Sequence, residues 1–148
     1  MPDEKILIVE DEIIVAMALE QKLLDLDYII VYTVSTGEDA VKCANQLKPD
    51  LILMDIILKG KMNGIEAATQ IKDKLDIPII YVTAYSYSEI TKHAPLIEPY
   101  EYLVKPFKKS ELNNHIKMSL SNHKAKKMEN INKKTLNKFQ GFVRSAKH

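Results

Sequence analysis

The chain has 148 residues, of which 46% are hydrophobic and 28% charged, and its formal net charge is +1. This length and composition are typical of one soluble globular domain with a core of its own. Cys43 is the single cysteine, which excludes an internal disulfide, and the longest apolar runs are far too short to cross a bilayer. Because acidic residues crowd the N-terminus, we expect no signal peptide, no membrane association and a cytoplasmic location.

Short, continuous apolar runs alternate along the chain with longer amphipathic segments. Runs rich in branched and aromatic residues predict strands buried on both faces, as in a parallel sheet. They are Ile6–Val9, Ile29–Val34, Leu51–Met54, Ile79–Val82 and Tyr102–Val104. Apolar residues at helical spacing follow each run: they begin at Ala40, Ile65 and Leu112 for three of the helices, and the first helix is marked by Ile13, Met17, Leu19, Leu23 and Leu24. Residues 86–94 predict a shorter and weaker helix. Pro95 is expected to end or kink this fourth helix.

This order is a strand followed by a helix, five times over. Parallel strands require crossover connections, and right-handed crossovers place helices on both faces of the sheet. The sequence therefore predicts an α/β fold with a doubly wound five-stranded parallel sheet.

The charge changes sign near residue 121. Residues 1–120 carry 13 Lys and Arg against 19 Asp and Glu, whereas residues 121–148 carry eight basic residues and only Glu129. We therefore predict two parts: a domain over residues 1–121, and a basic C-terminal extension over residues 122–148 that is either helical or a linker.

Four of the apolar runs end in a charged or reactive side chain. Glu10 and Asp11 follow the first run, Asp55 the third, Thr83 the fourth and Lys105 the fifth. Since the carboxyl ends of parallel strands share one edge of the sheet, these side chains are expected to meet there. Clustered carboxylates favour Mg²⁺, and a nearby lysine and hydroxyl suit the oxygens of a phosphoryl group. An aspartate can itself be the nucleophile. The pattern indicates metal-assisted phosphoryl transfer onto an aspartate.

The segments ILIVEDE, DLILMDIIL, PIIYVTAY and YLVKPF occur in this order and spacing. Over residues 4–121 the chain resembles the response-regulator receiver domain of two-component systems, of the chemotaxis-regulator kind. The resemblance implies a flavodoxin-like sheet with strand order 2-1-3-4-5. It also implies a signalling switch that catalyses its own phosphorylation and dephosphorylation, rather than a conventional enzyme.

The resemblance implies roles at the metal and acceptor positions. Asp55 would accept the phosphoryl group from a phosphohistidine. Asp11 would bind Mg²⁺ directly and Glu10 mostly through water, and Asp55 and the carbonyl of Ile57 would complete the protein ligands.

The resemblance also implies phosphate-binding and switch positions. Lys105, the Thr83 hydroxyl and the Ala84 N–H would bind phosphoryl oxygens, and the bond from Lys105 to Pro106 would be cis. Tyr102 would rotate inward as Thr83 moves, which would change the surface formed by the fourth helix, fifth strand and fifth helix.

Taken singly, these residues have ordinary structural interpretations. Asp55 could cap a strand end, Glu10 and Asp11 could be acids at a helix N-terminus, and Tyr102 could be a core tyrosine. Only their joint occurrence at four strand ends favours the phosphoryl-transfer interpretation.

The chain departs from the family pattern in three places. Glu10 stands where an aspartate is common, Lys59 replaces a usual proline, and one extra residue precedes Gly64. Ile57 and Tyr85 would flank the path of an attacking water. Because both are bulky, we predict slow self-dephosphorylation.

Other functions fit the residues less well. A haloacid-dehalogenase-type phosphatase would need a second aspartate two residues after Asp55, where Ile57 stands. No glycine-rich loop follows the first strand, which argues against a nucleotide-binding Rossmann domain. The chain could also be the N-terminal receiver fragment of a longer hybrid kinase or regulator.

The expected partners follow from the resemblance. A sensor histidine kinase or phosphotransfer protein would phosphorylate the chain, and a downstream protein or a missing output domain would respond to it. A homodimer is compatible with the resemblance. Direct nucleic-acid binding is not expected, because residues 122–148 are too few for a helix-turn-helix reader.

Overall fold

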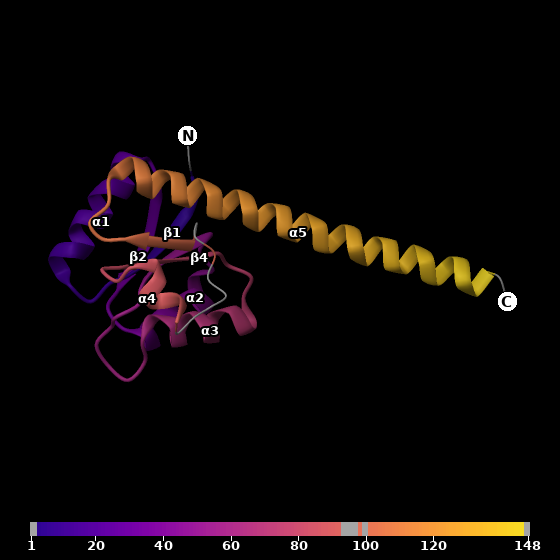
Figure 1. The fold of residues 1–148 in the computed structure, drawn as a ribbon, viewed down its shortest axis with the longest axis horizontal. Helices are drawn as coiled ribbons and strands as arrows, with labels where there is room; N and C mark the ends of the chain where they lie inside the picture. The colour runs from indigo at the N-terminus through magenta and orange to yellow at the C-terminus, as the bar shows by residue number, and fades with distance from the viewer. Residues whose placement is uncertain (1–2, 93–97, 99–100, 147–148) are drawn as a thin grey trace.

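The computed structural model describes residues 3–92, 98 and 101–146, and within them a five-stranded parallel sheet forms the centre of the molecule (Figure 1). The strand order is β2-β1-β3-β4-β5, which confirms the predicted fold class and topology. The strands are β1 (Lys5–Val9), β2 (Ile29–Val34), β3 (Leu51–Asp55), β4 (Ile79–Thr83) and β5 (Tyr102–Val104).

Helices cover both faces of this sheet. They are α1 (Ile13–Asp25), α2 (Gly37–Leu47), α3 (Gly64–Lys74), α4 (Tyr87–Thr91) and α5 (Lys109–Ala146). One core cluster joins Ala40 and Ala44 of α2, Ala68 and Ile71 of α3 and Ile90 of α4 to one face of the sheet. A second cluster joins Leu19 and Leu23 of α1 and Leu112 and Ile116 of α5 to the other face. The two clusters make the fold a three-layer sandwich.

The strands follow directly from their composition. All five residues of β3 and of β4 are buried, as continuous apolar runs between two helical layers require. β2 lies at an edge of the sheet, and its Ile29 and Tyr32 side chains are exposed.

Local sequence signals explain where several helices begin. The Thr36 side chain caps α2, and Asn63 and Glu66 form a reciprocal capping box at the start of α3. Ser86 caps α4, which begins at Tyr87. The predicted continuation of α4 toward Pro95 lies outside the described residues.

Two features of the helices differ from a simple amphipathic pattern. Among the apolar residues that predicted α1, Leu19 and Leu23 are buried, but Ile13, Met17 and Leu24 are exposed. α5 passes residue 121 without a break and projects far beyond the sheet (Figure 1). Every residue from Lys124 to Gly141 is exposed. None of the described helices is long and apolar enough to cross a membrane.

Candidate functional site

The sheet register brings the predicted site residues to one edge. Asp55 is the last residue of β3 and lies opposite Val82, while Thr83 is the last residue of β4 and lies opposite Val104. Glu10 and Asp11 follow β1 directly, and Lys105 follows β5. The carboxyl ends of four neighbouring strands therefore supply the whole set, as expected for an open parallel sheet.

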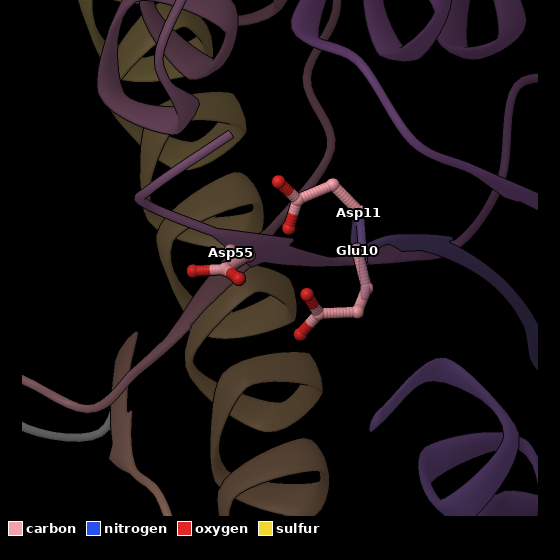
Figure 2. A group of neighbouring side chains, drawn as sticks. All are labelled: Glu10, Asp11 and Asp55. Carbon is pink, nitrogen blue, oxygen red and sulfur yellow. The ribbon is translucent and has the colours of Figure 1, made fainter. Parts of the chain in front are cut away.

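Glu10, Asp11 and Asp55 form a compact cluster of carboxylates (Figure 2). Each offers one oxygen, and these oxygens all lie within 4.8 Å of one another. Glu10 is 4% exposed and Asp55 is 7% exposed, whereas Asp11 lies at the half-buried mouth of the cluster. Like charges this close and this buried repel strongly unless a proton or a cation neutralises part of the charge.

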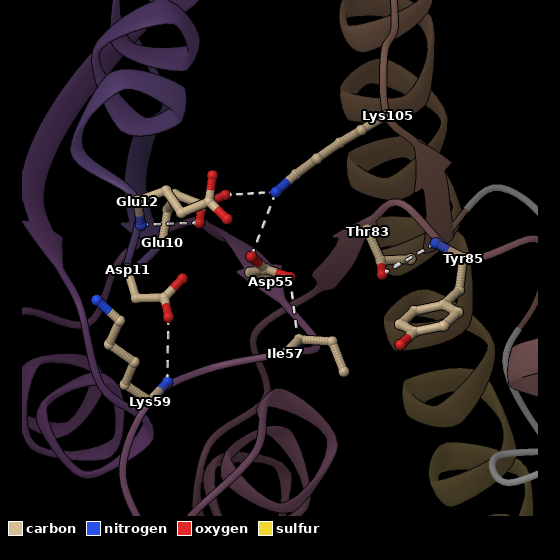
Figure 3. A network of polar contacts seen from close by, with 9 residues as sticks. All are labelled: Glu10, Asp11, Glu12, Asp55, Ile57, Lys59, Thr83, Tyr85 and Lys105. Atoms are coloured by element: carbon tan, nitrogen blue, oxygen red, sulfur yellow. Dashed lines mark hydrogen bonds and ion pairs between the residues drawn. The ribbon is translucent and has the colours of Figure 1, made fainter.

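Lys105 supplies a cation to this cluster (Figure 3). Its Nζ lies 2.6 Å from Oε1 of Glu10 and 3.2 Å from Oδ2 of Asp55. The backbone N–H of Lys105 donates to the carbonyl of Thr83 at 2.7 Å, which anchors the start of the loop to β4. The following peptide bond to Pro106 is cis, as predicted.

The protonation of the cluster is uneven. Burial raises the pKa of Asp55 to about 7, and the hydrogen bond and the charge of Glu10 add to this effect, although Lys105 opposes it. Burial also acts on Glu10, but hydrogen bonds from Lys105, from Asp55 and from the backbone at Glu12 outweigh it and lower the pKa of Glu10. Burial opposes the charge of Lys105, yet both carboxylates together raise its pKa. In the metal-free protein, Glu10 and Lys105 are therefore charged near neutral pH, while Asp55 is only partly ionised.

Three backbone N–H groups orient the three carboxylates (Figure 3). Glu12 donates to Oε2 of Glu10 at 3.2 Å, and Ile57 donates to Oδ1 of Asp55 at 3.1 Å. Lys59 donates to Oδ2 of Asp11, also at 3.2 Å. The sequence singled out Lys59 only as a replacement for proline, and this contact was not foreseen. Since proline has no N–H, the contact depends on that replacement.

Gly64 allows the loop after Asp55 to return close to the strand that it leaves. Its N–H donates to the carbonyl of Ile56 at 2.8 Å. A Cβ at Gly64 would lie only 2.0 Å from the carbonyl oxygen of Asp55. The backbone at the acceptor position is therefore fixed by a close approach that no larger residue permits.

Thr83 and Tyr102 occupy the other side of the site. Thr83 is buried, and its hydroxyl accepts a hydrogen bond from the N–H of Tyr85 at 3.3 Å. Tyr102 already lies inward and is 4% exposed. Its hydroxyl donates to the carbonyls of Tyr85 and, at 3.2 Å, Ser86, and its ring packs edge-on against Tyr87 with centroids 5.6 Å apart. The contact with Tyr87 was not apparent from the sequence.

The donor set fits a magnesium ion. Mg²⁺ prefers hard oxygen ligands and retains several waters, so two or three carboxylates at an open edge suit it. The carboxylate oxygens here are close together, partly buried and oriented by backbone N–H groups. Glu10 and Asp11 line a recess together with Ile13 and Met17, so two of the three carboxylates border an open surface depression.

Comparisons with known proteins agree with this geometry. A family model described as the response regulator receiver domain matches residues 6–117. The chain is similar to the transcriptional regulatory protein PdtaR of Mycobacterium tuberculosis (strain ATCC 25618 / H37Rv), with 37% identity over 117 residues. That match covers 79% of this chain but only 57% of PdtaR, so the chain corresponds to little more than half of that relative.

Solved structures give the same result. The signal receiver domain of a modulated diguanylate cyclase from Desulfovibrio desulfuricans G20 superposes with a TM-score of 0.77 and 34% identity, covering 84% of this chain and 99% of that one. The receiver domain of the sensor histidine kinase PA1611 from Pseudomonas aeruginosa PAO1, solved with magnesium coordinated in its active-site cleft, superposes with a TM-score of 0.72 and 29% identity. This superposition covers 81% of the present chain and 99% of the PA1611 receiver domain.

Proposed function

The chain belongs to the response regulator receiver domain family, and from this premise we propose that it is a phosphorylation switch whose acceptor is Asp55. The observation that carries the proposal is the juxtaposition of Glu10, Asp11, Asp55 and Lys105 at one edge of the sheet. In this reaction a carboxylate oxygen of Asp55 attacks the phosphorus of a phosphohistidine. The bond from phosphorus to the imidazole nitrogen breaks, and the imidazole leaves as the neutral base or takes a proton from water.

Each nearby group has a proposed task. Bound Mg²⁺ would offset the charge of the carboxylates and of the phosphoryl oxygens, held by Asp11, Asp55 and the carbonyl of Ile57, with Glu10 acting mostly through water. The magnesium coordinated in the active-site cleft of the PA1611 receiver domain supports this assignment. Metal binding requires the ionised form of Asp55, which a pKa of about 7 leaves only partly populated near neutral pH, and the ionised carboxylate is also the nucleophile.

Lys105, Thr83 and Ala84 would bind the transferred group. Lys105 already reaches Asp55 and can turn its Nζ to a phosphoryl oxygen without leaving the site. Within the described part of the chain, the Thr83 hydroxyl accepts a single long hydrogen bond, from Tyr85, so it can move toward the phosphate. The loop after β4 would follow, and because Tyr102 donates to carbonyls of that loop, the surface of α4, β5 and α5 would change with it.

We propose that the chain acts as a switch rather than as a turnover enzyme. The residue two positions after Asp55 is Ile57, whose side chain carries no acid or base to activate a water. Ile57 and Tyr85 are both exposed at the mouth of the site, where they would hinder water, so we propose slow self-dephosphorylation. A phosphoryl half-life of seconds at neutral pH would contradict this part.

The proposed division of the chain is a receiver domain over residues 1–121 and an extension over residues 122–148. The proposed phosphoryl donor is a sensor histidine kinase or a phosphotransfer protein. The proposed target is a downstream protein, or an output module of a longer regulator. That last alternative is consistent with a match that covers 57% of PdtaR.

The test is to incubate the protein with acetyl phosphate and Mg²⁺ and to record its intact mass. We expect a gain of one phosphoryl group in the wild type and in Asp50→Asn, which alters an aspartate at the opposite end of β3. Asp55→Asn, and the wild type in EDTA, should gain none. Equal labelling of Asp55→Asn and the wild type would refute the assignment of the acceptor.

A further inference from the structure

α1 carries an apolar stripe on the side that faces away from the sheet. Ala16, Leu19 and Leu23 fill its core-facing side. Ile13, Met17 and Leu24 lie along the outer side, and Ile14 beside them is 82% exposed. Glu20 lies among these outer residues, but apolar side chains still occupy both the inner and the outer side of the helix, and an apolar side is normally covered. The outer side of α1 is therefore a candidate contact surface.

The extension of α5 carries a second apolar stripe. Met128, Ile131, Leu136 and Phe139 are all exposed, and at 3.6 residues per turn they occupy less than half of the helix circumference. Lysines at positions 124, 127, 134 and 138 lie along one edge of this stripe, the edge that Ile131 occupies. Because this part of α5 projects beyond the sheet, no described part of the same chain covers the stripe (Figure 1).

The two surfaces have opposite charge. Residues 12–27, which include α1, hold Glu12, Glu20, Asp25 and Asp27 against Lys22, a net charge of −3. Residues 122–141 hold six lysines against Glu129, a net charge of +5. A polyanion as the partner would pair with the lysines of the extension, but it would leave the apolar stripe exposed. Side-by-side pairing of two extensions would bury the stripes but would bring two lysine-rich helices together.

We propose that the α5 extension of one copy docks along the outer side of α1 of a second copy, and that the second copy reciprocates. Such a contact matches apolar stripe to apolar stripe and basic flank to acidic flank, which favours α1 over a second extension as the partner surface. The lengths are compatible, since residues 122–146 span about 37 Å as a helix and α1 about 20 Å. Reciprocal docking closes a two-fold dimer and leaves no free extension.

This dimer borders the phosphoacceptor site. α1 begins two residues after Asp11, and Ile13 and Met17 line the same recess as Glu10 and Asp11. A helix docked on α1 therefore lies beside the entrance to the site. The proposal nevertheless stands apart from the assignment of Asp55, because the contact surfaces contain no acceptor or metal ligand.

The first test is the mass of the full chain in solution by light scattering, at increasing salt. At low salt we expect twice the 16.9 kDa of one chain, with a dissociation constant at or below about 10 μM. The dimer should weaken as salt rises, because screening reduces the attraction between opposite charges. A monomer at low salt, or a dimer that strengthens with salt, would overturn the proposal.

Three matched substitutions locate the contact. Leu24→Gln on α1 and Leu136→Gln on the extension should each raise the dissociation constant at least about tenfold, because an apolar contact is lost twice in a reciprocal dimer. Leu47→Gln, at the end of α2 on the other side of the sheet, should not change it; the three leucines are 55%, 55% and 45% exposed. Circular dichroism confirms that each variant is folded. A dimer unaffected by both Leu24→Gln and Leu136→Gln would contradict the proposed surfaces.

Cysteine cross-linking separates docking on α1 from pairing of extensions. In a Cys43→Ala background, Leu24→Cys protein is mixed with Leu136→Cys protein under mild oxidation. The proposal predicts a disulfide between the two different chains that exceeds the product of either chain alone. A Leu136→Cys homodimer as the dominant product would show extension-to-extension pairing and would overturn the proposal.

Discussion

Replacing Asp55 with Asn in the metal-free protein is expected to raise its stability at pH 8. Asp55 has an ordinary pKa of 3.8, which burial and the nearby Glu10 raise to about 7 in the folded state. The folded protein therefore holds this proton between pH 3.8 and about 7, where the unfolded chain has lost it. Stability falls as pH rises through this window, by about 1.4 kcal/mol per pH unit. Above about pH 7 this loss of stability is complete, and the Asp55→Asn variant does not suffer it because Asn cannot ionise.

The size of the effect follows from the same shift. About three pKa units correspond to at most about 4 kcal/mol, which for a chain of this length is a rise of roughly 10 °C in Tm. The ion pair of Asp55 with Lys105 alone would predict the opposite sign, because Asn breaks it. Burial and repulsion from Glu10 outweigh that pair, so the sign of the change tests which effect dominates.

The assay is urea denaturation in EDTA at pH 4 and at pH 8 for the wild type, Asp55→Asn and Asp73→Asn. Asp73 is an exposed aspartate on α3 and serves as the matched control. The gain from Asp55→Asn should be large at pH 8 and nearly absent at pH 4. A variant that is less stable than the wild type at pH 8, or a gain of equal size at both values, would refute the reasoning.

Three further substitutions probe the same site. Gly64→Ala should lower the free energy of unfolding by at least about 2 kcal/mol, because its Cβ would meet the Asp55 carbonyl at 2.0 Å; Gly141→Ala, with no atom within 4 Å, should not. Equal urea midpoints for these two variants would contradict the close approach. Lys105→Met should lower the free energy of unfolding of the metal-free protein by about 2–3 kcal/mol, because it removes the cation between the buried side chains of Glu10 and Asp55. Since Mg²⁺ can then supply the missing positive charge, Mg²⁺ should raise the Tm of this variant more than it raises the Tm of the wild type. An unchanged Mg²⁺-induced shift in Tm would argue against a shared site. Tyr102→Phe should cost about 1 kcal/mol, because it removes hydrogen bonds to two loop carbonyls; a neutral thermal melt would mean that these bonds contribute nothing.

The parts of the fold that the sequence predicted well are those set by burial alone. β3 and β4 are continuous apolar runs because helices cover both of their faces, and such runs are readily recognised. Once the strands are parallel, their carboxyl ends must share an edge, so the cluster of Glu10, Asp11 and Asp55 also follows from the sequence.

Features that depend on the exact path of a loop could not be predicted. The contact from the Lys59 N–H to Asp11 requires the loop after Asp55 to fold back, which no periodicity encodes. The inward position of Tyr102 depends on carbonyls of the β4–α4 loop. The uneven protonation of Asp55 and Glu10 depends on distances of a few ångströms.

The helices, too, have features that the sequence predicted and features that it could not predict. Apolar spacing predicted α1, but of the apolar residues that marked it, Leu19 and Leu23 are buried whereas Ile13, Met17 and Leu24 are exposed. Spacing cannot distinguish a buried face from an exposed one when both are apolar. The continuity of α5 through residue 121 was left open, because the change of charge there is not a helix-breaking signal.

The most direct measurement of the central claim is the position of the phosphoryl group. The protein is phosphorylated with acetyl phosphate and Mg²⁺, reduced with borohydride to convert an acyl phosphate into homoserine, and digested with trypsin. Residues 43–59 form one tryptic peptide, because Pro49 protects the bond after Lys48, and this peptide contains both Asp50 and Asp55. We predict homoserine at position 55 with Asp50 intact. Homoserine at any other position, or phosphorylated protein with none at position 55, would contradict the account.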